Sequence, residues 1–104
     1  MAIKYATDTT YEELVSEGVV LVDFFGVNCG PCKMLARVLE ELEDEFPFIN
    51  IVKVDVDQCP ETAKQFHING IPDLYYYKDG QVITHETGFG NKDMILSSLA
   101  KILY

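Results

Sequence analysis

Long apolar runs and amphipathic segments alternate along this chain. Val19 to Phe25 is an almost continuous apolar run, which is typical of a strand covered on both faces, and Ile49 to Val56 is a second strand of this buried type with Lys53 and Asp55 inside it. Between them, from Lys33 to Phe46, apolar residues recur with the spacing of an amphipathic helix. The residues expected on its buried stripe are Met34, Leu35, Val38, Leu39, Leu42 and Phe46.

Weaker signals predict three short elements before and after these two strands and their connecting helix. Ile3 to Ala6 has the pattern of a short strand, and Pro60 to Phe66 has that of a short helix. Thr10 and Glu13 have the spacing of a capping box, so another short helix is expected to start there and to end near Gly18.

The second half of the chain predicts a hairpin and a final helix. Two strands, Ile71 to Lys78 and Gln81 to Thr87, are separated by Asp79-Gly80, a strong signal for a tight antiparallel turn. The last helix is expected to begin at or near Asn91. Its apolar stripe comprises Ile95, Leu99 and Ile102, with Met94 and Leu103 near it.

This order of elements indicates an α/β fold. Strands that alternate with helices and then give way to a hairpin and a helix form mixed sheets that are covered on both sides. We expect a central mixed sheet of four to five strands flanked by four helices. The 104 residues suffice for a single domain with one core, spanning residues 1–104, and no linker or repeat divides them.

The charge balance narrows the range of partners. Acidic residues number 17 against 8 basic ones, which gives a net charge of −9. Nucleic acids and anionic membrane surfaces attract the opposite charge, so we expect binding to neither. Solubility is the simplest role for most of this charge.

The cysteine count and the N-terminal sequence indicate a reducing compartment. Three cysteines are an odd number, which disfavours a framework of structural disulfides. The segment from Met1 to Ala6 lacks the apolar core of a signal peptide, and no apolar run is long enough to span a membrane. We therefore expect a cytoplasmic protein.

The chemistry of the chain is concentrated in Asn28-Cys29-Gly30-Pro31-Cys32. The motif lies between a predicted strand and a predicted helix, which puts Cys29 at the helix N-terminus. The positive end of the helix dipole favours an anion there, and the thiolate is the nucleophile of sulfur chemistry. Residues three apart share a helix face, so Cys32 is within reach of Cys29. The motif thus predicts a dithiol that closes into a disulfide and reopens.

Half of a zinc site is the alternative interpretation of these two cysteines. Structural zinc sites usually have four ligands. The remaining candidates, Cys59, His67 and His85, form no second paired motif. We therefore favour redox chemistry, with no metal and no bound cofactor.

Asp23 interrupts the apolar strand that precedes the motif. In a sheet covered on both faces its carboxyl group would be buried, which raises the pKa of an acid. A buried acid beneath the dithiol could accept the proton of Cys32 as that thiol attacks. The alternative is a side chain that reaches water at a sheet edge.

A Cys-Gly-Pro-Cys motif after a strand carrying Asp23, with Ile71-Pro72 downstream, closely resembles the thioredoxin family. The resemblance extends over nearly the whole chain. It implies the thioredoxin fold, with the active-site turn at the C-terminal end of a central strand, where open sheets generally place their sites. It also implies that Asp23 matches the family's buried Asp, for which the proton-accepting role is proposed.

The two cysteines and Lys53 are expected to have distinct roles. Cys29, nearer to solvent, would attack a substrate disulfide, and the more buried Cys32 would resolve the mixed disulfide. Lys53 matches a lysine that family members carry near the buried acid, so it would modulate Asp23. An ordinary surface lysine is the alternative.

Ile71-Pro72 resembles the family's cis-proline element, which faces the cysteines. The exposed backbone of Ile71 would pair with an extended substrate segment, as in strand addition. For Val56 and Gly88, packing and turn geometry are the alternative roles. The shallow apolar docking surface that the resemblance implies comprises Gly30, Pro31, Val56, Ile71, Pro72 and Gly88.

Three residues depart from the family pattern. Asn28 stands where most members have tryptophan, so a polar amide replaces a large apolar contact beside the thiols. Asp73 replaces the usual threonine after the proline, and, if ionised and close to Cys29, it would raise the pKa of that thiol. Arg37 replaces a proline within the helix, which predicts a straighter helix. These differences concern the choice of reductase and substrates rather than the dithiol mechanism.

Cys59 lies outside the motif, and a free cysteine is usually a small buried apolar residue. Its position in a loop before a helix leaves partial exposure and oxidation as the alternative. His67 and His85 are interpreted as surface or turn residues rather than ligands.

Together these features predict a thiol–disulfide oxidoreductase that reduces protein disulfides as a monomer and is recharged by a thioredoxin reductase. Whether that reductase depends on nicotinamide or on ferredoxin stays open. A binding or adaptor module of the same fold, with an incidental dithiol, is the alternative from another class. A third interpretation, an oxidant or isomerase, is disfavoured because no secretion signal is found.

Overall fold

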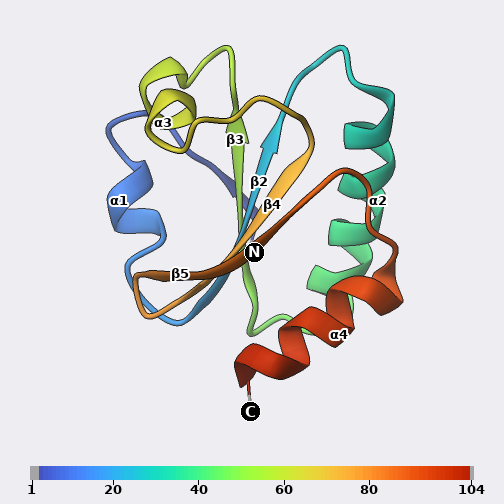
Figure 1. Cartoon of the computed structure of the whole chain (residues 1–104). Helices are drawn as coiled ribbons and strands as arrows, with labels where there is room; N and C mark the ends of the chain where they lie inside the picture. The colour runs from blue at the N-terminus through green and yellow to red at the C-terminus, as the bar shows by residue number, and fades with distance from the viewer. Residues whose placement is uncertain (1–2, 104) are drawn as a thin grey trace.

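The computed structural model describes residues 3–103, so Met1 and Ala2 of the N-terminal segment, and Tyr104, lie outside it. Within this range five strands and four helices follow one another (Figure 1). The strands are β1 (Ile3–Tyr5), β2 (Val19–Phe25), β3 (Asn50–Asp55), β4 (Asp73–Lys78) and β5 (Gln81–Thr87). The helices are α1 (Tyr11–Leu14), α2 (Gly30–Glu45), α3 (Pro60–Gln65) and α4 (Lys92–Leu103).

The five strands form one mixed sheet in the order β1-β3-β2-β4-β5. β3 pairs in parallel with β1 and β2, whereas β4 pairs antiparallel with β2 and β5. β2 is therefore the central strand, and its Asp23 lies opposite Lys53 on one side and Leu74 on the other. The expected mixed sheet with four helices is confirmed.

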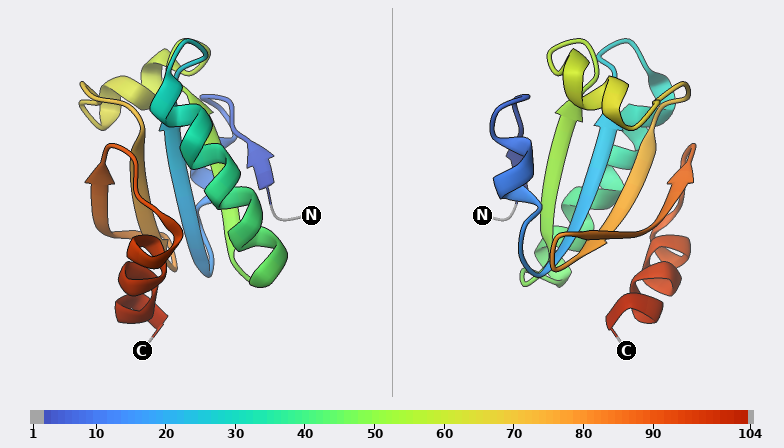
Figure 2. Two further views of the ribbon diagram at one scale, coloured as in Figure 1. Left: turned by 90° about the vertical axis from the view of Figure 1, so that its right-hand side faces the viewer. Right: turned by 60° about the vertical axis from the view of Figure 1, so that its left-hand side comes forward.

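Helices cover both faces of this sheet (Figures 1 and 2). One face carries α1 and α3 over an aromatic-rich cluster that includes Tyr11 and Tyr75. The other face carries α2 and α4 over a largely aliphatic cluster that includes Leu39 and Leu99. Side chains alternate between the faces of a strand, so β2 contributes to both clusters. Burial on two sides explains why its sequence is apolar apart from Asp23.

The predicted apolar stripe of α2 is confirmed at its centre and wrong at Met34. Leu35 and Leu39 are both 1% exposed, whereas Met34 is 54% exposed. Neighbouring residues are rotated by about 100° around a helix, so Met34 and Leu35 cannot both face the sheet. For the same reason Met94 is exposed beside the buried Ile95 in α4.

The capping box predicted at Thr10 does not form. The backbone of Thr10 is helical, and its side chain makes no capping hydrogen bond. Its hydroxyl oxygen instead accepts a hydrogen bond from the Thr7 N–H at 2.8 Å. α1 ends at Leu14, well before Gly18, whose φ of 73° serves the turn into β2.

The hairpin and the last helix follow the prediction. Asp79 and Gly80 have φ of 50° and 84°, as a type I′ turn requires. The Asp79 carboxylate also accepts a hydrogen bond from the Gly18 N–H at 3.0 Å, which ties this turn to the start of β2. Asn91 caps α4, because its side-chain oxygen accepts a hydrogen bond from the Met94 N–H at 2.9 Å.

In residues 3–103, no helix is both long and apolar enough to cross a membrane.

Candidate redox site

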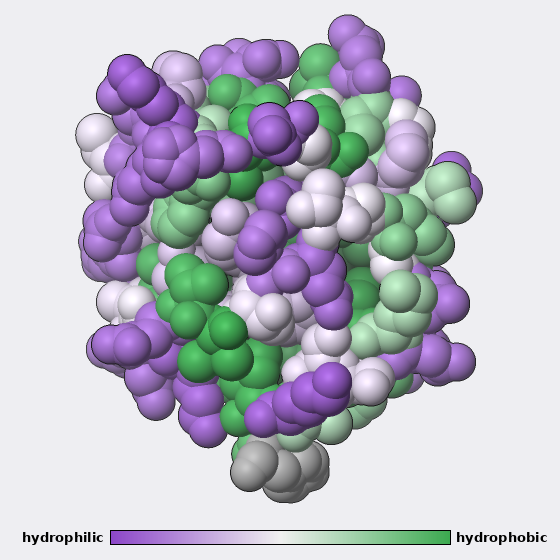
Figure 3. Space-filling view, in the orientation of Figure 1, coloured by the Kyte–Doolittle hydropathy of each residue, from purple (hydrophilic) through white to green (hydrophobic). Residues whose placement is uncertain are grey.

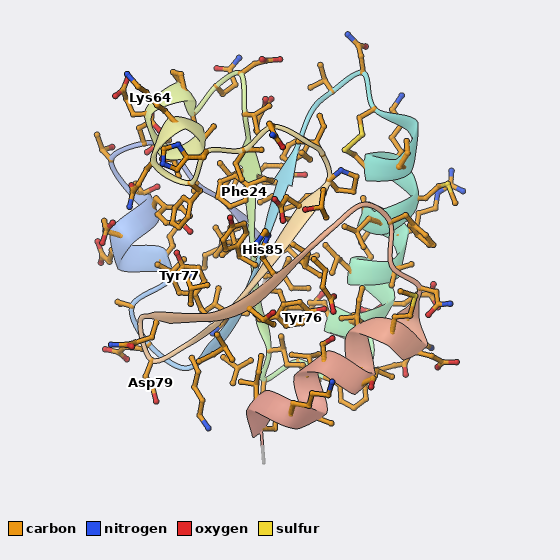
Figure 4. All side chains as sticks on the ribbon, viewed as in Figure 1. Phe24, Lys64, Tyr76, Tyr77, Asp79 and His85 are labelled. Atoms are coloured by element: carbon orange, nitrogen blue, oxygen red, sulfur yellow. A yellow bond between two sulfur atoms is a disulfide. The ribbon has the colours of Figure 1, made fainter. Side chains whose placement is uncertain are left out.

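The two cysteines of the motif lie at the start of α2, just after β2 has ended. Cys29 is the N-cap residue, and its sulfur accepts a hydrogen bond from the Cys32 N–H at 3.2 Å. The two sulfurs form a disulfide across a Cα–Cα distance of 5.2 Å, drawn in yellow in Figure 4. Cys29 is partly exposed, whereas Cys32 is only 3% exposed. The sulfur of Cys29 is therefore the more accessible of the two.

Small and rigid residues make this helix start possible. Pro31 lies in the first turn of α2, where its missing N–H is not needed. Gly26, between β2 and the motif, allows a neighbouring loop to come close. A Cβ atom at Gly26 would lie 2.7 Å from Cδ1 of Ile71. The motif thus faces the loop before β4.

The Ile71–Pro72 peptide bond is cis, as the resemblance implied. The carbonyl oxygen of Ile71 lies 3.9 Å from the sulfur of Cys29. On the other side of the turn, the Gly88 N–H donates a hydrogen bond to the Pro72 carbonyl oxygen at 2.7 Å. Gly88 has a φ of 94°, which favours glycine at this position. Ile71, Pro72 and Gly88 therefore form one edge of the redox site.

Asp23 lies in the middle of β2 and is completely buried. Its Oδ2 atom is 3.2 Å from Nζ of Lys53 on the neighbouring strand. Among the described residues, neither carboxylate oxygen of Asp23 accepts a well-formed hydrogen bond. Burial raises the pKa of Asp23, and the Lys53 ammonium opposes that rise. Asp23 is thus a carboxyl group that holds a proton more readily than an exposed one.

Lys53 is not an ordinary surface lysine. It is 8% exposed, and its ammonium lies 4.7 Å from the centre of the Phe25 ring. A cleft of about 210 Å³ has both Lys53 and Cys32 in its wall. Its full lining comprises Phe25, Gly26, Val27, Cys32, Lys33, Ala36 and Lys53. The partner of Asp23 and the buried cysteine therefore face the same space.

Asp73 has a partner that the sequence analysis missed. It is the first residue of β4 and is 5% exposed, and its Oδ1 atom lies 2.9 Å from Nδ1 of His85 on β5. His85, labelled in Figure 4, also stacks on Tyr75, with ring centroids 4.6 Å apart. The interpretation of His85 as a surface residue fits its half-exposed side chain but overlooks this contact. The sequence held no clear signal for this contact, because a two-residue turn alone would put Thr84 opposite Tyr75. An irregularity between Tyr76 and Tyr77 shifts the register, so that His85 lies opposite Tyr75 and diagonal to Asp73.

The other predicted docking residues differ in exposure. Asn28, Gly30, Pro31 and Ile71 are exposed around Cys29, whereas Pro72 is buried beneath them. Val56 is half-buried and packs against the aromatic-rich cluster.

Two large exposed side chains next to Gly88 were not predicted. Phe89 is 39% exposed and Met94 is 55% exposed. Both line a small cleft together with Gly88. The sequence Gly88-Phe89-Gly90 contained a signal, because an aromatic residue between two glycines in a loop has few neighbours to bury it.

Cys59 takes no part in this site. It is 1% exposed, and its thiol donates a hydrogen bond to the Ala6 carbonyl oxygen at 3.3 Å. Burial raises the pKa of this thiol. The expectation of a buried apolar cysteine is confirmed, and the alternative of partial exposure is wrong. In the part of the chain that the structure describes, no three His, Cys, Asp or Glu side chains are grouped so as to hold a metal ion.

A disulfide between residues three apart at a helix N-terminus, set against a cis-proline turn on a mixed sheet, is the arrangement of a dithiol–disulfide oxidoreductase. Comparison with known proteins agrees. The thioredoxin family model matches residues 2–101. The chain is 46% identical to the thioredoxin of Bacillus subtilis over 104 residues, which cover 99% of this chain and all of that one.

Two further relatives lead to the same assignment. The chain is 46% identical to the thioredoxin of Listeria monocytogenes over 92 residues, 88% of this chain and 89% of the relative. It is 38% identical to the thioredoxin of Chlamydia muridarum over 99 residues, 95% of this chain and 97% of the relative. The chain therefore belongs to the thioredoxin family. It is a thiol–disulfide oxidoreductase, and its partners are of two kinds, a reductase and disulfide substrates.

Proposed function

We propose that this protein reduces protein disulfides with Cys29 as the attacking thiol and Cys32 as the resolving thiol. The observation that carries the proposal is the unequal exposure of two sulfurs at one helix N-terminus. A substrate disulfide within a protein is bulky and can approach only the accessible sulfur. A thiolate at Cys29 is also stabilised by the Cys32 N–H and by the helix dipole.

The reaction consists of two exchanges. In the first, the Cys29 thiolate attacks one sulfur of the substrate disulfide, forms a mixed disulfide and releases the other substrate sulfur as a thiolate. In the second, Cys32 loses its proton and attacks the sulfur of Cys29, which releases the second substrate thiolate and closes the Cys29–Cys32 disulfide. Two electrons pass from the protein to the substrate, and the two substrate thiolates take up protons.

Asp23 accepts the proton of Cys32 in the second exchange. Its support is a fully buried carboxyl group with a raised pKa, paired with a lysine that lines the same cleft as Cys32. A base with a raised pKa holds the proton better once it has been transferred. Lys53 is a positioning residue, which holds the carboxylate and limits the rise of its pKa.

The substrate segment docks on the cis-proline turn. Ile71 is 36% exposed, and its carbonyl oxygen lies beside the attacking sulfur, so an extended segment can pair with its backbone. Pro72 and Asp73 shape this edge from beneath. The remaining contact surface comprises Asn28, Gly30, Pro31, Val56 and Gly88.

The same proposal covers the reductase partner, the location in the cell and the oligomeric state. The protein acts in the cytoplasm as a monomeric single domain and is recharged by a thioredoxin reductase. The similarity to bacterial thioredoxins supports this, as does a single sheet that both clusters share.

Insulin reduction in the presence of dithiothreitol tests the proposed function. The wild type is expected to accelerate insulin precipitation, and Cys29→Ser should reduce the rate to that of dithiothreitol alone. In a separate reaction without dithiothreitol, reduced Cys32→Ser should trap the substrate as a mixed disulfide on Cys29, visible by mass spectrometry. Cys59→Ser is the matched control and should keep the wild-type rate. Equal rates for the wild type and Cys29→Ser would instead support the adaptor function.

A further inference from the structure

Asp73 and His85 form a second pair of buried acid and basic partner beside the redox site. Asp23 and Lys53 lie on the sheet face covered by α2 and α4. Side chains alternate along a strand, so Asp73 lies with Tyr75 on the opposite face, which α1 and α3 cover. The surroundings of the dithiol thus contain two buried carboxylates, and each has its own basic partner.

Asp73 is close to the redox site along the chain, although its side chain lies on the sheet face opposite α2. It follows the cis-proline directly, and the carbonyl oxygen of Ile71, two residues earlier, lies 3.9 Å from the sulfur of Cys29. Two residues of chain span at most about 7 Å. Asp73 is 5% exposed, so water screens its charge poorly. A carboxylate without a hydrogen-bond donor at this point would disfavour negative charge on Cys29.

His85 is placed to donate a hydrogen bond to that carboxyl group. A carboxylate can only accept hydrogen bonds, so the tautomer of His85 with its hydrogen on Nδ1 donates across the 2.9 Å to Asp73. Stacking on Tyr75, with the two ring planes 19° apart, fixes the orientation of the imidazole. Burial and, to a lesser extent, Asp73 raise the pKa of Tyr75, so its phenol stays neutral. The imidazole is therefore the hydrogen-bond partner of Asp73.

We propose that His85 is a positioning residue for the redox reaction, which holds the Asp73 carboxylate on the β5 side with a hydrogen bond, so that a thiolate can form at Cys29 near a buried acid. The inference rests on the proposed function, because it takes Cys29 as the attacking thiol. It requires that Asp73 and His85 act on Cys29 as a coupled unit.

A double-mutant cycle on the reactivity of Cys29 tests this inference. The reduced protein is alkylated with iodoacetamide over a range of pH, and the label on Cys29 is quantified by peptide mapping. His85→Phe keeps an aromatic ring against Tyr75 but removes the N–H donor. We expect alkylation of Cys29 at neutral pH to slow by about threefold or more in this variant.

The second arm of the cycle removes the charge itself. Asp73→Asn added to His85→Phe should restore alkylation at least to the wild-type rate, because no carboxylate remains at this position. In the wild-type background, Asp73→Asn should change the rate less than it does beside Phe at position 85. His67→Asn is the matched control, since it removes the other histidine and asparagine tolerates the φ of 52° there. Its profile should equal that of the wild type.

Two results would overturn the proposal. The first is an unchanged pH profile in His85→Phe, and the second is additive effects of the two substitutions, because either would mean that His85 only packs. If His85→Phe does not fold, the same cycle with His85→Ala decides. Failure of the proposed function would be recognised separately, since the label on the wild type would then appear first on Cys32.

Discussion

At the scale of single residues, burial without full hydrogen bonding determines the chemistry of Asp23. The carboxyl group is completely buried in the central strand, and Lys53 is its partner at 3.2 Å. Removing a carboxylate from water costs more than one ammonium in this geometry returns, so the folded state favours the protonated acid. The residue proposed to accept the proton of Cys32 therefore weakens the fold when it is ionised.

The unfavourable free energy of burying the ionised Asp23 carboxylate predicts how stability depends on pH. Its folded pKa lies above the ordinary value of 3.8, so the folded state binds more protons between these two values. The free energy of unfolding then falls as pH rises through this window, by about 1.4 kcal/mol per pKa unit of difference. Asp23→Asn removes the ionisation, so its advantage over the wild type should grow across the window and then level off.

Urea unfolding at a series of pH values measures this advantage. The exposed Asp57→Asn is the control, and its difference from the wild type should not follow the same course. A difference between Asp23→Asn and the wild type that stays constant with pH would contradict the raised pKa of Asp23.

At the scale of elements, Glu86 joins three of them. The Tyr76 hydroxyl on β4 donates to one carboxylate oxygen at 2.6 Å, and the Ser98 hydroxyl on α4 donates to the other at 2.6 Å. Burial and the bond to Glu86 raise the pKa of Tyr76, so it remains a donor. The hairpin and the last helix are thus held together by polar contacts as well as by the aliphatic cluster.

This junction predicts the effect of removing one hydroxyl. Tyr76→Phe should lower the free energy of unfolding by about 1–2 kcal/mol, because one oxygen of a partly buried carboxylate loses its donor. Chemical denaturation followed by circular dichroism measures the loss. Tyr5→Phe, at a side chain that is 68% exposed, is the matched control and should cost much less. Equal losses in the two variants would show that the hydroxyl of Tyr76 contributes nothing.

Elements whose signals are local were predicted well from the sequence. β2 and β5 have the predicted bounds, because a continuous apolar run fixes one and a turn dipeptide fixes the start of the other. The capping box failed because the Thr7 N–H competes for the Thr10 hydroxyl, and such competition cannot be seen in residue spacing.

The same distinction applies to the redox site. The dithiol and the burial of Asp23 follow from local patterns, whereas the cis-proline and the relation of Lys53 to Asp23 came from the family resemblance. The pair of Asp73 and His85 needed the register between two strands, which a one-dimensional pattern does not specify.

At the scale of the whole molecule, one sheet serves two cores. The aromatic-rich and aliphatic clusters lie on opposite faces of the same strands, so neither can lose its sheet without the other. The structure therefore supports a single cooperative unit.

Outside these cores the surface mixes hydrophilic groups with exposed apolar ones (Figure 3), including Val82 and Ile83 on the edge strand β5.

Cooperative unfolding of the two clusters can be tested with a substitution in one of them. Leu39→Ala, in the aliphatic cluster, should lower the free energy of unfolding by about 2–5 kcal/mol. Far-ultraviolet circular dichroism and the near-ultraviolet signal of the tyrosines should shift to the same new midpoint, although Tyr11, Tyr75 and Tyr77 lie on the other face and Tyr76 lies in the aliphatic cluster. Separate midpoints for the two signals would mean that the two faces unfold independently.

The position of Cys59 has a consequence for the molecule as a carrier. Of the three cysteine sulfurs in the chain, this one is buried against the Ala6 carbonyl oxygen, which leaves the Cys29–Cys32 couple as the accessible thiol chemistry among residues 3–103. Each molecule is consequently either reduced or oxidised at this couple, and it transfers its electrons two at a time. Because the oxidised protein exposes no free thiol among residues 3–103, oxidised molecules do not become joined to one another by disulfides.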